Sequence, residues 1–212
     1  MVLGLDTCLS TCSVAVLDGE RVLAHVSEVM ARGHQERLAP MAQAVMRAAA
    51  LPFASLQRIG VTVGPGSFTG LRVGVAFAKG LASALTIPAA GVGTLEALAA
   101  DVEGLAFAVI DARREQVYCQ AFEAGEALTA PDILPLAAAV ARLAEIGQDR
   151  PLTLVGSGAG LLAQAAPGAT VIAAEGADAR AVARLAARRN PGALIPLYLR
   201  APDARPSLAA GP

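Results

Sequence analysis

The chain has 212 residues, of which 55% are apolar, 3% aromatic and 17% charged. This apolar fraction is enough for a folded core, and a formal net charge of -1 excludes a highly charged, intrinsically disordered chain. Because 17 lysines and arginines balance 18 aspartates and glutamates, the totals give no sign of a basic nucleic-acid-binding surface.

The sequence predicts a cytoplasmic protein without membrane association. Residues 151–174 are uncharged and long enough to cross a bilayer, but glycines and prolines interrupt them and predict turns. Asp6 lies inside the first apolar run and no basic segment precedes it, which argues against a signal peptide. Cys8, Cys12 and Cys119 lack metal-ligand spacing and are expected to be buried thiols in a reducing compartment.

The first hundred residues predict a sheet and three helices. Apolar runs and alternation favour strands at residues 2–5, 12–17, 21–29, 59–63 and 88–92. After Gly33 the period becomes that of an amphipathic helix, ended by Pro52, with the stripe Leu38, Met41, Ala42, Val45, Met46 and Ala49. A helix at 71–85 is apolar nearly all round and should be covered, and a short helix at 94–100 has Thr94 as its expected N-cap.

From Gly104 the same outline is repeated: a strand with an aspartate at its end, a turn, and a returning strand. We expect strands at residues 105–110, 116–122 and 152–155, and helices at 133–146, 158–166 and 177–189. The prediction is an α/β protein with two lobes, 1–103 and 104–200, followed by a loose tail at 201–212. A last short strand is expected at 197–199, and a return of residues 196–200 to the first lobe is left open.

The loop from Gly64 to Gly70 is a candidate anion site. It joins a buried strand to a helix N-terminus, where unpaired N–H groups and the helix dipole suit a phosphate. Gly66 and the two flanking glycines permit close backbone approach, and Ser67 and Thr69 add hydroxyl groups. The spacing and lysine of a P-loop are absent, and the alternative is a rigid turn that packs two elements closely.

Three polar residues lie at strand ends that are expected to face the same cleft: Asp6, Thr7 and Asp111. A carboxylate at such a position can hold Mg²⁺ or orient water, although a lone aspartate more often forms a turn. The turn at residues 112–115 is bulky and offers neither glycine nor hydroxyl, which argues against a nucleotide held between two hairpins. The glycine run at 156–160 is a weak signal.

Neither histidine has a partner that would complete a metal or catalytic site. His25 and His34 lack paired ligands, and no serine–histidine–aspartate pattern surrounds them. We therefore expect His25 to be an ordinary strand residue and His34 an ordinary residue at a helix N-terminus. No cofactor is expected, and the purified protein should hold no stoichiometric zinc or iron.

Several stretches resemble one family. They are LDT at 5–7 with CSVA at 12–15, HQERL at 34–38, GPGSFTGLRVG at 64–74 with AKGL at 78–81, DAR at 111–113 with VY at 117–118, and PLYLR at 196–200. Together they resemble the TsaB family, also called YeaZ, of bacterial tRNA threonylcarbamoyladenosine synthesis. The match is dense over residues 1–120 and thinner afterwards.

The resemblance implies an actin-like (ASKHA) fold, with two lobes that each hold a mixed sheet flanked by helices. It also implies a role supporting TsaD, the related enzyme that transfers a threonylcarbamoyl group to N6 of adenosine 37 in tRNAs reading codons that begin with A. TsaD-like enzymes begin their first helix with an H-x-x-x-H metal motif. The corresponding positions here are His34 and Leu38, so the second ligand is missing.

The resemblance therefore implies a non-catalytic partner of TsaD. A TsaE-like ATPase would be reached through the complex, the chain alone would form a homodimer, and tRNA would be contacted indirectly. The main alternative is an ATP-dependent phosphotransferase or ATPase of the same superfamily, whose anion site would comprise Asp6, Thr7, Gly64, Gly66, Ser67, Thr69 and Gly70. A zinc peptidase fails on the number of ligands.

The predicted partner surface lies on the two long helices of the first lobe. Small residues every fourth position on the second helix should let the first pack closely against it. The resemblance implies that the pair meets its counterpart in TsaD, or in a second copy, as a four-helix bundle. The candidate residues are Leu38, Met41, Ala42, Val45, Met46, Gly74 and Ala78. The alternative is that Leu38, Met41 and Val45 face their own sheet.

Overall fold

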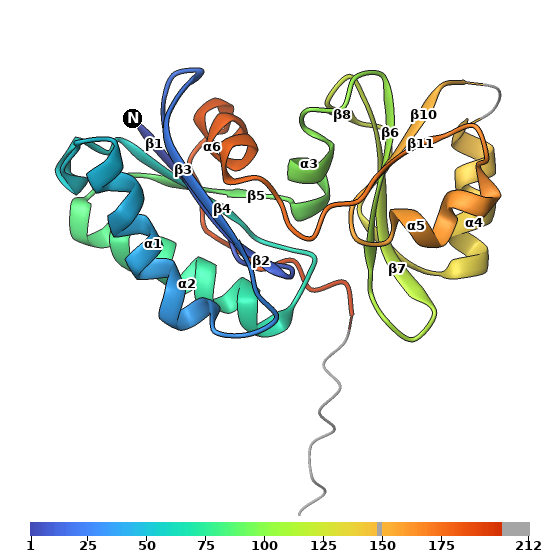
Figure 1. Ribbon diagram of the computed structural model, residues 1–212, viewed down its shortest axis with the longest axis horizontal. Helices are drawn as coiled ribbons and strands as arrows, with labels where there is room; N and C mark the ends of the chain where they lie inside the picture. The colour runs from blue at the N-terminus through green and yellow to red at the C-terminus, as the bar shows by residue number, and fades with distance from the viewer. Residues whose placement is uncertain (148–149, 201–212) are drawn as a thin grey trace, which may run out of the picture.

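The structure, a computed structural model, describes residues 1–147 and 150–200. It has two lobes side by side, each built on a twisted sheet (Figure 1). The sheet of the first lobe has the order β3-β2-β1-β4-β5. Its first three strands are antiparallel, and β4 and β5 run parallel to β1. The strands are β1 (Val2–Asp6), β2 (Thr11–Asp18), β3 (Arg21–Val29), β4 (Arg58–Thr62) and β5 (Ala89–Val92).

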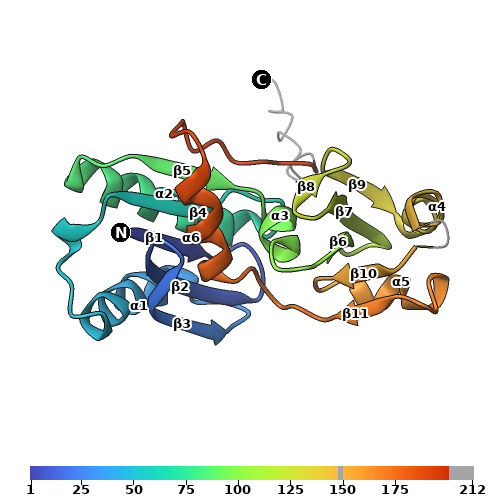
Figure 2. The same cartoon turned by 90° about the horizontal axis from the view of Figure 1, so that it is seen from above.

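Helices cover both faces of this sheet. α1 (His34–Ala48) and α2 (Phe68–Leu85) pack on one face, and α6 (Ala179–Arg188) packs on the other (Figure 1). A 3-10 turn, η1 (Phe53–Ser55), precedes β4, and α3 (Thr94–Ala99) lies between the lobes (Figure 2). The core of the first lobe lies between the sheet and the α1–α2 pair.

α6 approaches the sheet closely because small residues face each other. Gly4 and Gly60 are paired across β1 and β4. A Cβ atom added at Gly4 would lie 2.1 Å from the carbonyl oxygen of Ala179, and one at Gly60 would lie 2.4 Å from the Cβ of Ala186. Arg58 Nη1 donates a hydrogen bond of 2.8 Å to the Ala186 carbonyl oxygen, which satisfies an acceptor in the last turn of α6.

The second lobe has a sheet of order β11-β10-β6-β7-β8, with β9 also paired to β7. Its strands are β6 (Leu105–Asp111), β7 (Gln116–Glu123), β8 (Glu126–Ala127), β9 (Asp132–Pro135), β10 (Leu152–Val155) and β11 (Thr170–Ile172). Its helices are α4 (Leu136–Gly147), α5 (Ala159–Leu162) and the 3-10 turn η2 (Ala163–Ala165). They pack against the sheet around a second apolar core.

A third apolar cluster joins the lobes. Leu95 and Leu98 of α3 pack with residues of β6 and β7, including Ile110 and Phe122. Leu9, from the turn between β1 and β2, packs against the same cluster. The two lobes therefore meet through apolar side chains.

The predicted division at residue 103 separates the two sheets, but not all of the helices. α6 follows the second lobe in sequence yet packs on the sheet of the first. Contacts between small residues of a helix and of a sheet leave no signal in the hydrophobic periodicity of the two elements. The sequence pattern therefore places α6 in the second lobe, within whose predicted bounds it lies. Residues 201–212, predicted as a tail, lie outside the described part.

Several element boundaries also differ from the prediction. The expected helix at 133–146 begins at Leu136, because residues 132–135 form β9. Thr94 is the first residue of α3 and not its N-cap; the preceding Gly93 has its N–H bound by the Glu96 carboxylate at 3.3 Å. The predicted helix at 158–166 is only one α-helical turn followed by η2, and β8 and β11 were not predicted.

The last segment returns to the first lobe without forming a strand. No strand covers residues 197–199, but the N–H of Leu197 donates to the Val63 carbonyl oxygen at 2.7 Å. Leu194 is buried in the core of the first lobe. Across residues 1–147 and 150–200, no helix has the length and hydropathy to span a membrane.

Candidate functional site

Asp6 ends β1 and is completely buried. Its Oδ1 atom accepts hydrogen bonds from Thr62 Oγ1 at 2.6 Å and from the Cys8 N–H at 3.2 Å, and its Oδ2 accepts from the Ala177 N–H at 3.0 Å. Burial raises the pKa of Asp6, and the three hydrogen bonds lower it by less. The carboxyl group thus ties β1 to β4 and to the segment that leads into α6.

Thr7 holds the turn after β1 against the start of α2. Its Oγ1 donates to the Gly70 carbonyl oxygen at 2.7 Å. A Cβ at Gly70 would lie 2.0 Å from the Thr7 carbonyl oxygen, and one at Gly74 would lie 2.5 Å from Thr7 Oγ1. These glycines are required because the backbone approaches so closely.

The glycine-rich loop uses several of its polar groups inside the protein. The Ser67 N–H donates to the Cys8 carbonyl oxygen at 2.7 Å. Ser67 Oγ accepts from the Gly70 N–H at 3.3 Å, so Ser67 is the N-cap of α2. The structure brings Asp6, Thr7 and this loop together as predicted, and anion binding by the loop stays a prediction.

His34 has a defined structural role that the sequence did not reveal. The residue is 8% exposed, and its Nε2 lies 3.1 Å from the carbonyl oxygens of both Leu9 and Thr11. Because carbonyl oxygens only accept, Nε2 carries the hydrogen and donates it. His34 thus ties the first turn of α1 to the turn between β1 and β2, while Leu38 lies in the core beneath the helix.

The turn between β6 and β7 is the counterpart, in the second lobe, of the turn between β1 and β2. Arg113, Arg114 and Glu115 have φ angles of 63°, 54° and 57°. Each left-handed residue of this kind costs about 1–2 kcal/mol. Asp111 offsets part of this cost, since its Oδ1 accepts from the Arg113 N–H at 2.8 Å and its Oδ2 from Arg113 Nη1 at 3.0 Å.

A polar cleft of about 420 Å³ lies between the two turns. Both lobes contribute to its lining, and the charged and hydroxyl-bearing residues are Ser10, Ser67, Asp111, Arg113, Tyr118, Ser157, Glu175 and Arg200. Charges of both signs are present, and two of them, Asp111 and Arg113, already pair with each other. Across the described residues, no group of three or more histidine, cysteine, aspartate or glutamate side chains has metal-binding geometry.

A second polar cluster, which the sequence did not predict, lies at the start of α6. His25 Nε2 is 3.2 Å from Ser13 Oγ and 3.7 Å from Asp178 Oδ1. A catalytic triad would use both ring nitrogens, and Ser13 is buried and already accepts the Ala179 N–H at 3.2 Å. The cluster therefore holds the N-terminus of α6 against β2 and β3.

The predicted partner surface requires a correction. α1 and α2 pack together as expected. However, the candidate side chains face inward: Leu38, Met41, Ala42, Val45, Met46 and Ala78 are at most 2% exposed, and Gly74 is buried against Thr7. These residues contact their own sheet, as the alternative held, because the most apolar stripe of each helix covers the core.

The outward face of α2 is a different set of residues. Ala76, Lys79, Gly80, Ser83 and Ala84 are exposed, and a Cβ added at Gly80 would meet nothing within 4 Å. Beside them the larger apolar side chains Val73, Phe77 and Leu81 are half-buried. This face is smooth and mostly uncharged, which suits contact with another helix.

Comparison with known proteins connects the fold to one family. The family model described as TsaD, tRNA N6-adenosine threonylcarbamoyltransferase, matches residues 25–152. An uncharacterized protein of Mycobacterium tuberculosis is 35% identical over 97% of this chain and 94% of its own length. The tRNA threonylcarbamoyladenosine biosynthesis protein TsaB of Bacillus subtilis is 38% identical over 55% of this chain and 52% of its own.

Among solved structures, YeaZ from Pseudomonas aeruginosa is similar over nearly the whole chain. The two superpose with a TM-score of 0.81 at 30% identity, covering 93% of this chain and 99% of that one. The similarity therefore includes both lobes, whereas the TsaB match of Bacillus subtilis covers about half of each protein.

Proposed function

Because this chain belongs to the TsaB/YeaZ family, with its two-lobed actin-like fold, we propose that it serves threonylcarbamoyladenosine formation in tRNA as a non-catalytic partner of a TsaD-like enzyme. The modified position would be adenosine 37 of tRNAs that read codons beginning with A. The protein would act in the cytoplasm.

The observation that carries the non-catalytic role is the environment of His34. In the family resemblance this histidine stands where a TsaD-like enzyme begins its metal motif. Here its Nε2 hydrogen is shared between two backbone carbonyl groups, and the position four residues later is Leu38 in the core. These hydrogen bonds support the proposal that His34 has a structural role here and does not bind a metal.

The outward face of α2 is the proposed contact with the TsaD-like partner. Its exposed small residues permit close helix approach, and α1 lies beside it, so a pair of helices can meet a second pair. The same face would form a homodimer when the partner is absent. A TsaE-like ATPase and tRNA would be reached through the partner.

Complementation and co-purification test this proposal. Cells depleted of this chain should lose threonylcarbamoyladenosine from their tRNA, measured by mass spectrometry of nucleosides, and the tagged chain should recover a TsaD-like protein. Ala76→Glu places a charge on the outward face of α2. This variant should neither restore threonylcarbamoyladenosine to the depleted cells nor recover the TsaD-like protein. Ala141→Glu makes the same change at an exposed position of α4. This control should restore the modification and recover the partner as the unchanged chain does.

The polar cleft between the lobes is where an ATP-dependent phosphotransferase or ATPase would bind its nucleotide, and this second candidate function can be tested. Turnover of ATP by the chain alone, together with normal tRNA modification in its absence, would replace the partner role with the phosphotransferase role. Loss of modification without any ATP turnover by the purified chain would support the partner role.

A further inference from the structure

The chain crosses between the lobes once more than its topology requires. The first crossing runs from α3 into β6, and the second runs from β11 into α6. These two suffice to insert the second lobe into the first. Residues 190–200, here called the strap, then leave α6, run along the first lobe and cross to the second lobe again (Figure 2).

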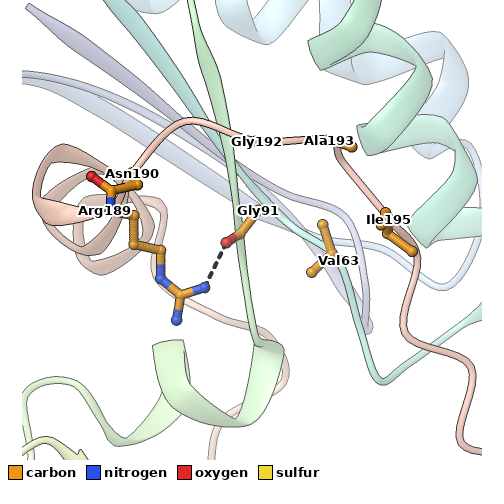
Figure 3. Close-up of a pocket in the computed structure, with 7 residues that line it drawn as sticks. All are labelled: Val63, Gly91, Arg189, Asn190, Gly192, Ala193 and Ile195. Atoms are coloured by element: carbon orange, nitrogen blue, oxygen red, sulfur yellow. Dashed lines mark hydrogen bonds between the residues drawn. The ribbon is translucent and has the colours of Figure 1, made fainter.

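The first lobe contacts the strap at several points between Gly192 and Tyr198. The Gly192 N–H donates to the Ala89 carbonyl oxygen at 3.4 Å, and Leu194 is 4% exposed in the core. Figure 3 shows the strap passing Val63 and Gly91. Arg189, the residue before the strap, donates a hydrogen bond of 2.8 Å to the Gly91 carbonyl oxygen.

Two aromatic rings fix the strap to the first turns of α2. The Tyr198 hydroxyl accepts from Arg72 Nε at 3.1 Å, and its ring centroid lies 5.5 Å from that of Phe68. The Arg72 guanidinium lies 3.8 Å over the Phe68 ring, a cation–π contact. Phe68 and Tyr198 are about half exposed, so the Tyr198 side chain is held at the surface by its contacts with Phe68 and Arg72.

Within the next two residues the strap is bound by the second lobe. Leu199 packs against the interlobe apolar cluster. Arg200 Nη2 donates to Gln116 Oε1, at the start of β7, at 2.6 Å. The strap thus connects α2 to the sheet of the second lobe.

We propose that the strap is a latch that holds the two lobes in one relative orientation. Two crossings alone leave a hinge, because the lobes can rotate about the axis that joins them. The strap and the β11–α6 crossing lie on opposite sides of α3, so a contact through the strap acts away from that axis (Figure 2). Proteins of hinged two-lobed design close around a ligand, whereas a latched pair presents one fixed surface.

The distance between spin labels on the two lobes tests this latch. Labels are attached at Ala48→Cys on α1 and Ala141→Cys on α4, both exposed positions. The native thiols are buried, and burial raises the pKa of Cys8 and Cys12 to about 12 and of Cys119 to about 11, so they react slowly at neutral pH. The unmodified strap should give one narrow distance distribution.

Arg200→Ala and Tyr198→Ala should each broaden this distribution and add a second population. Gln116→Ala removes the same hydrogen bond from the second lobe and should have the effect of Arg200→Ala, and the two changes together should add nothing further. Arg37→Ala removes a guanidinium that pairs with Glu28 inside the first lobe, and it should leave the distribution narrow.

Two results would overturn the latch. One is a broad or double distribution in the chain with its strap intact. The other is an unchanged distribution in variants that remain folded by circular dichroism. If Arg200→Ala fails to fold, Gln116→Ala decides alone, since it leaves every residue of the strap unchanged.

Discussion

At the scale of single residues, His25 of the edge strand β3 lies beside Asp178, the N-cap residue of α6. Burial lowers the pKa of His25 from its ordinary value of 6.5, and Arg180 adds to this effect, whereas the nearby Asp178 opposes it. The unfolded chain therefore binds this proton at a higher pH than the folded chain does. Stability linked to His25 is present above pH 6.5 and is lost as the pH falls toward the lower folded pKa.

The first prediction concerns this linkage. The free energy of unfolding, measured with urea, should fall between pH 7.5 and 5.5 as a result of the proton uptake described above. His25→Gln keeps a hydrogen-bonding side chain without the titration, so its stability should fall less over the same interval. Equal slopes for both proteins would show that His25 has the same pKa in the folded and unfolded chains.

Single residues also show where sequence-based prediction ends. Asp6, Thr7 and the loop from Gly64 to Gly70 were expected together, because strand ends and helix starts meet at one edge of such a sheet, and they do lie together. The carbonyl partners of His34 could not be predicted, because a histidine at a helix start does not reveal what lies across from it. The same holds for the approach of Ala177 to Asp6 from a segment far along the chain.

At the scale of elements, the contact between α6 and the sheet depends on two glycines that no periodicity identifies. Gly60 lies on β4 beneath α6, and an added methyl group would overlap Ala186. Gly80 lies on the open side of α2, where an added methyl group touches nothing. The two positions make a matched pair for the same substitution.

The second prediction uses this pair. Gly60→Ala should lower the free energy of unfolding by about 1–3 kcal/mol, because the sheet and α6 are forced apart. Gly80→Ala should raise it by about 0.5–1 kcal/mol, because alanine loses less backbone entropy than glycine on helix formation. Chemical denaturation of both variants measures the difference. A stable Gly60→Ala variant would mean that α6 shifts without penalty.

The third prediction concerns α1. Met41 is 2% exposed in the core, so Met41→Asp should destabilise the fold by roughly several kcal/mol through burial of a charge. Thermal melting should therefore fall steeply, with partner binding lost only as a result of unfolding. A folded Met41→Asp variant that has lost a TsaD-like partner would instead place Met41 in the interface and contradict the inward orientation of the stripe.

The helices and central strands could be predicted because their periodicity is strong over many residues. The α1 stripe identified the helix correctly but left its partner undecided, since an apolar face signals burial without saying against what. Residues 133–135 of β9 were assigned to a helix because they directly precede α4 and because Ile133 and Leu134 share its apolar character. β11 is three residues long and none of them is buried, so it has no alternating pattern to detect.

At the scale of the whole molecule, the two hairpin turns that face the interlobe cleft are occupied by the protein's own groups. Leu9 fills the cleft side of the first turn with an apolar side chain, and Asp111 pairs with Arg113 in the second. The loop beside them donates the Ser67 N–H to Cys8. A phosphate bound through the Ser67 N–H or the Arg113 guanidinium would have to compete with these contacts.

The fourth prediction follows from this arrangement. The purified chain should release no phosphate from ATP above the rate without protein, because the Ser67 and Gly70 N–H groups and the Thr7 hydroxyl already donate hydrogen bonds within the protein. Phosphate release is measured with and without Asp6→Ala, alongside the melting temperature. Turnover that disappears in a stable Asp6→Ala variant would show that the cleft is catalytic.

The position of α6 has a consequence for how the protein is made. Its residues are synthesised after the whole second lobe, yet they cover a face of the first sheet that is complete once β5 has emerged. At about 5–20 residues per second, the ribosome needs several seconds to add the second lobe and then α6. During that interval the nascent first lobe exposes the strip around Gly4 and Gly60 to solvent. A chaperone that shields nascent chains would have its longest opportunity to bind on this strip, and release would coincide with the arrival of α6.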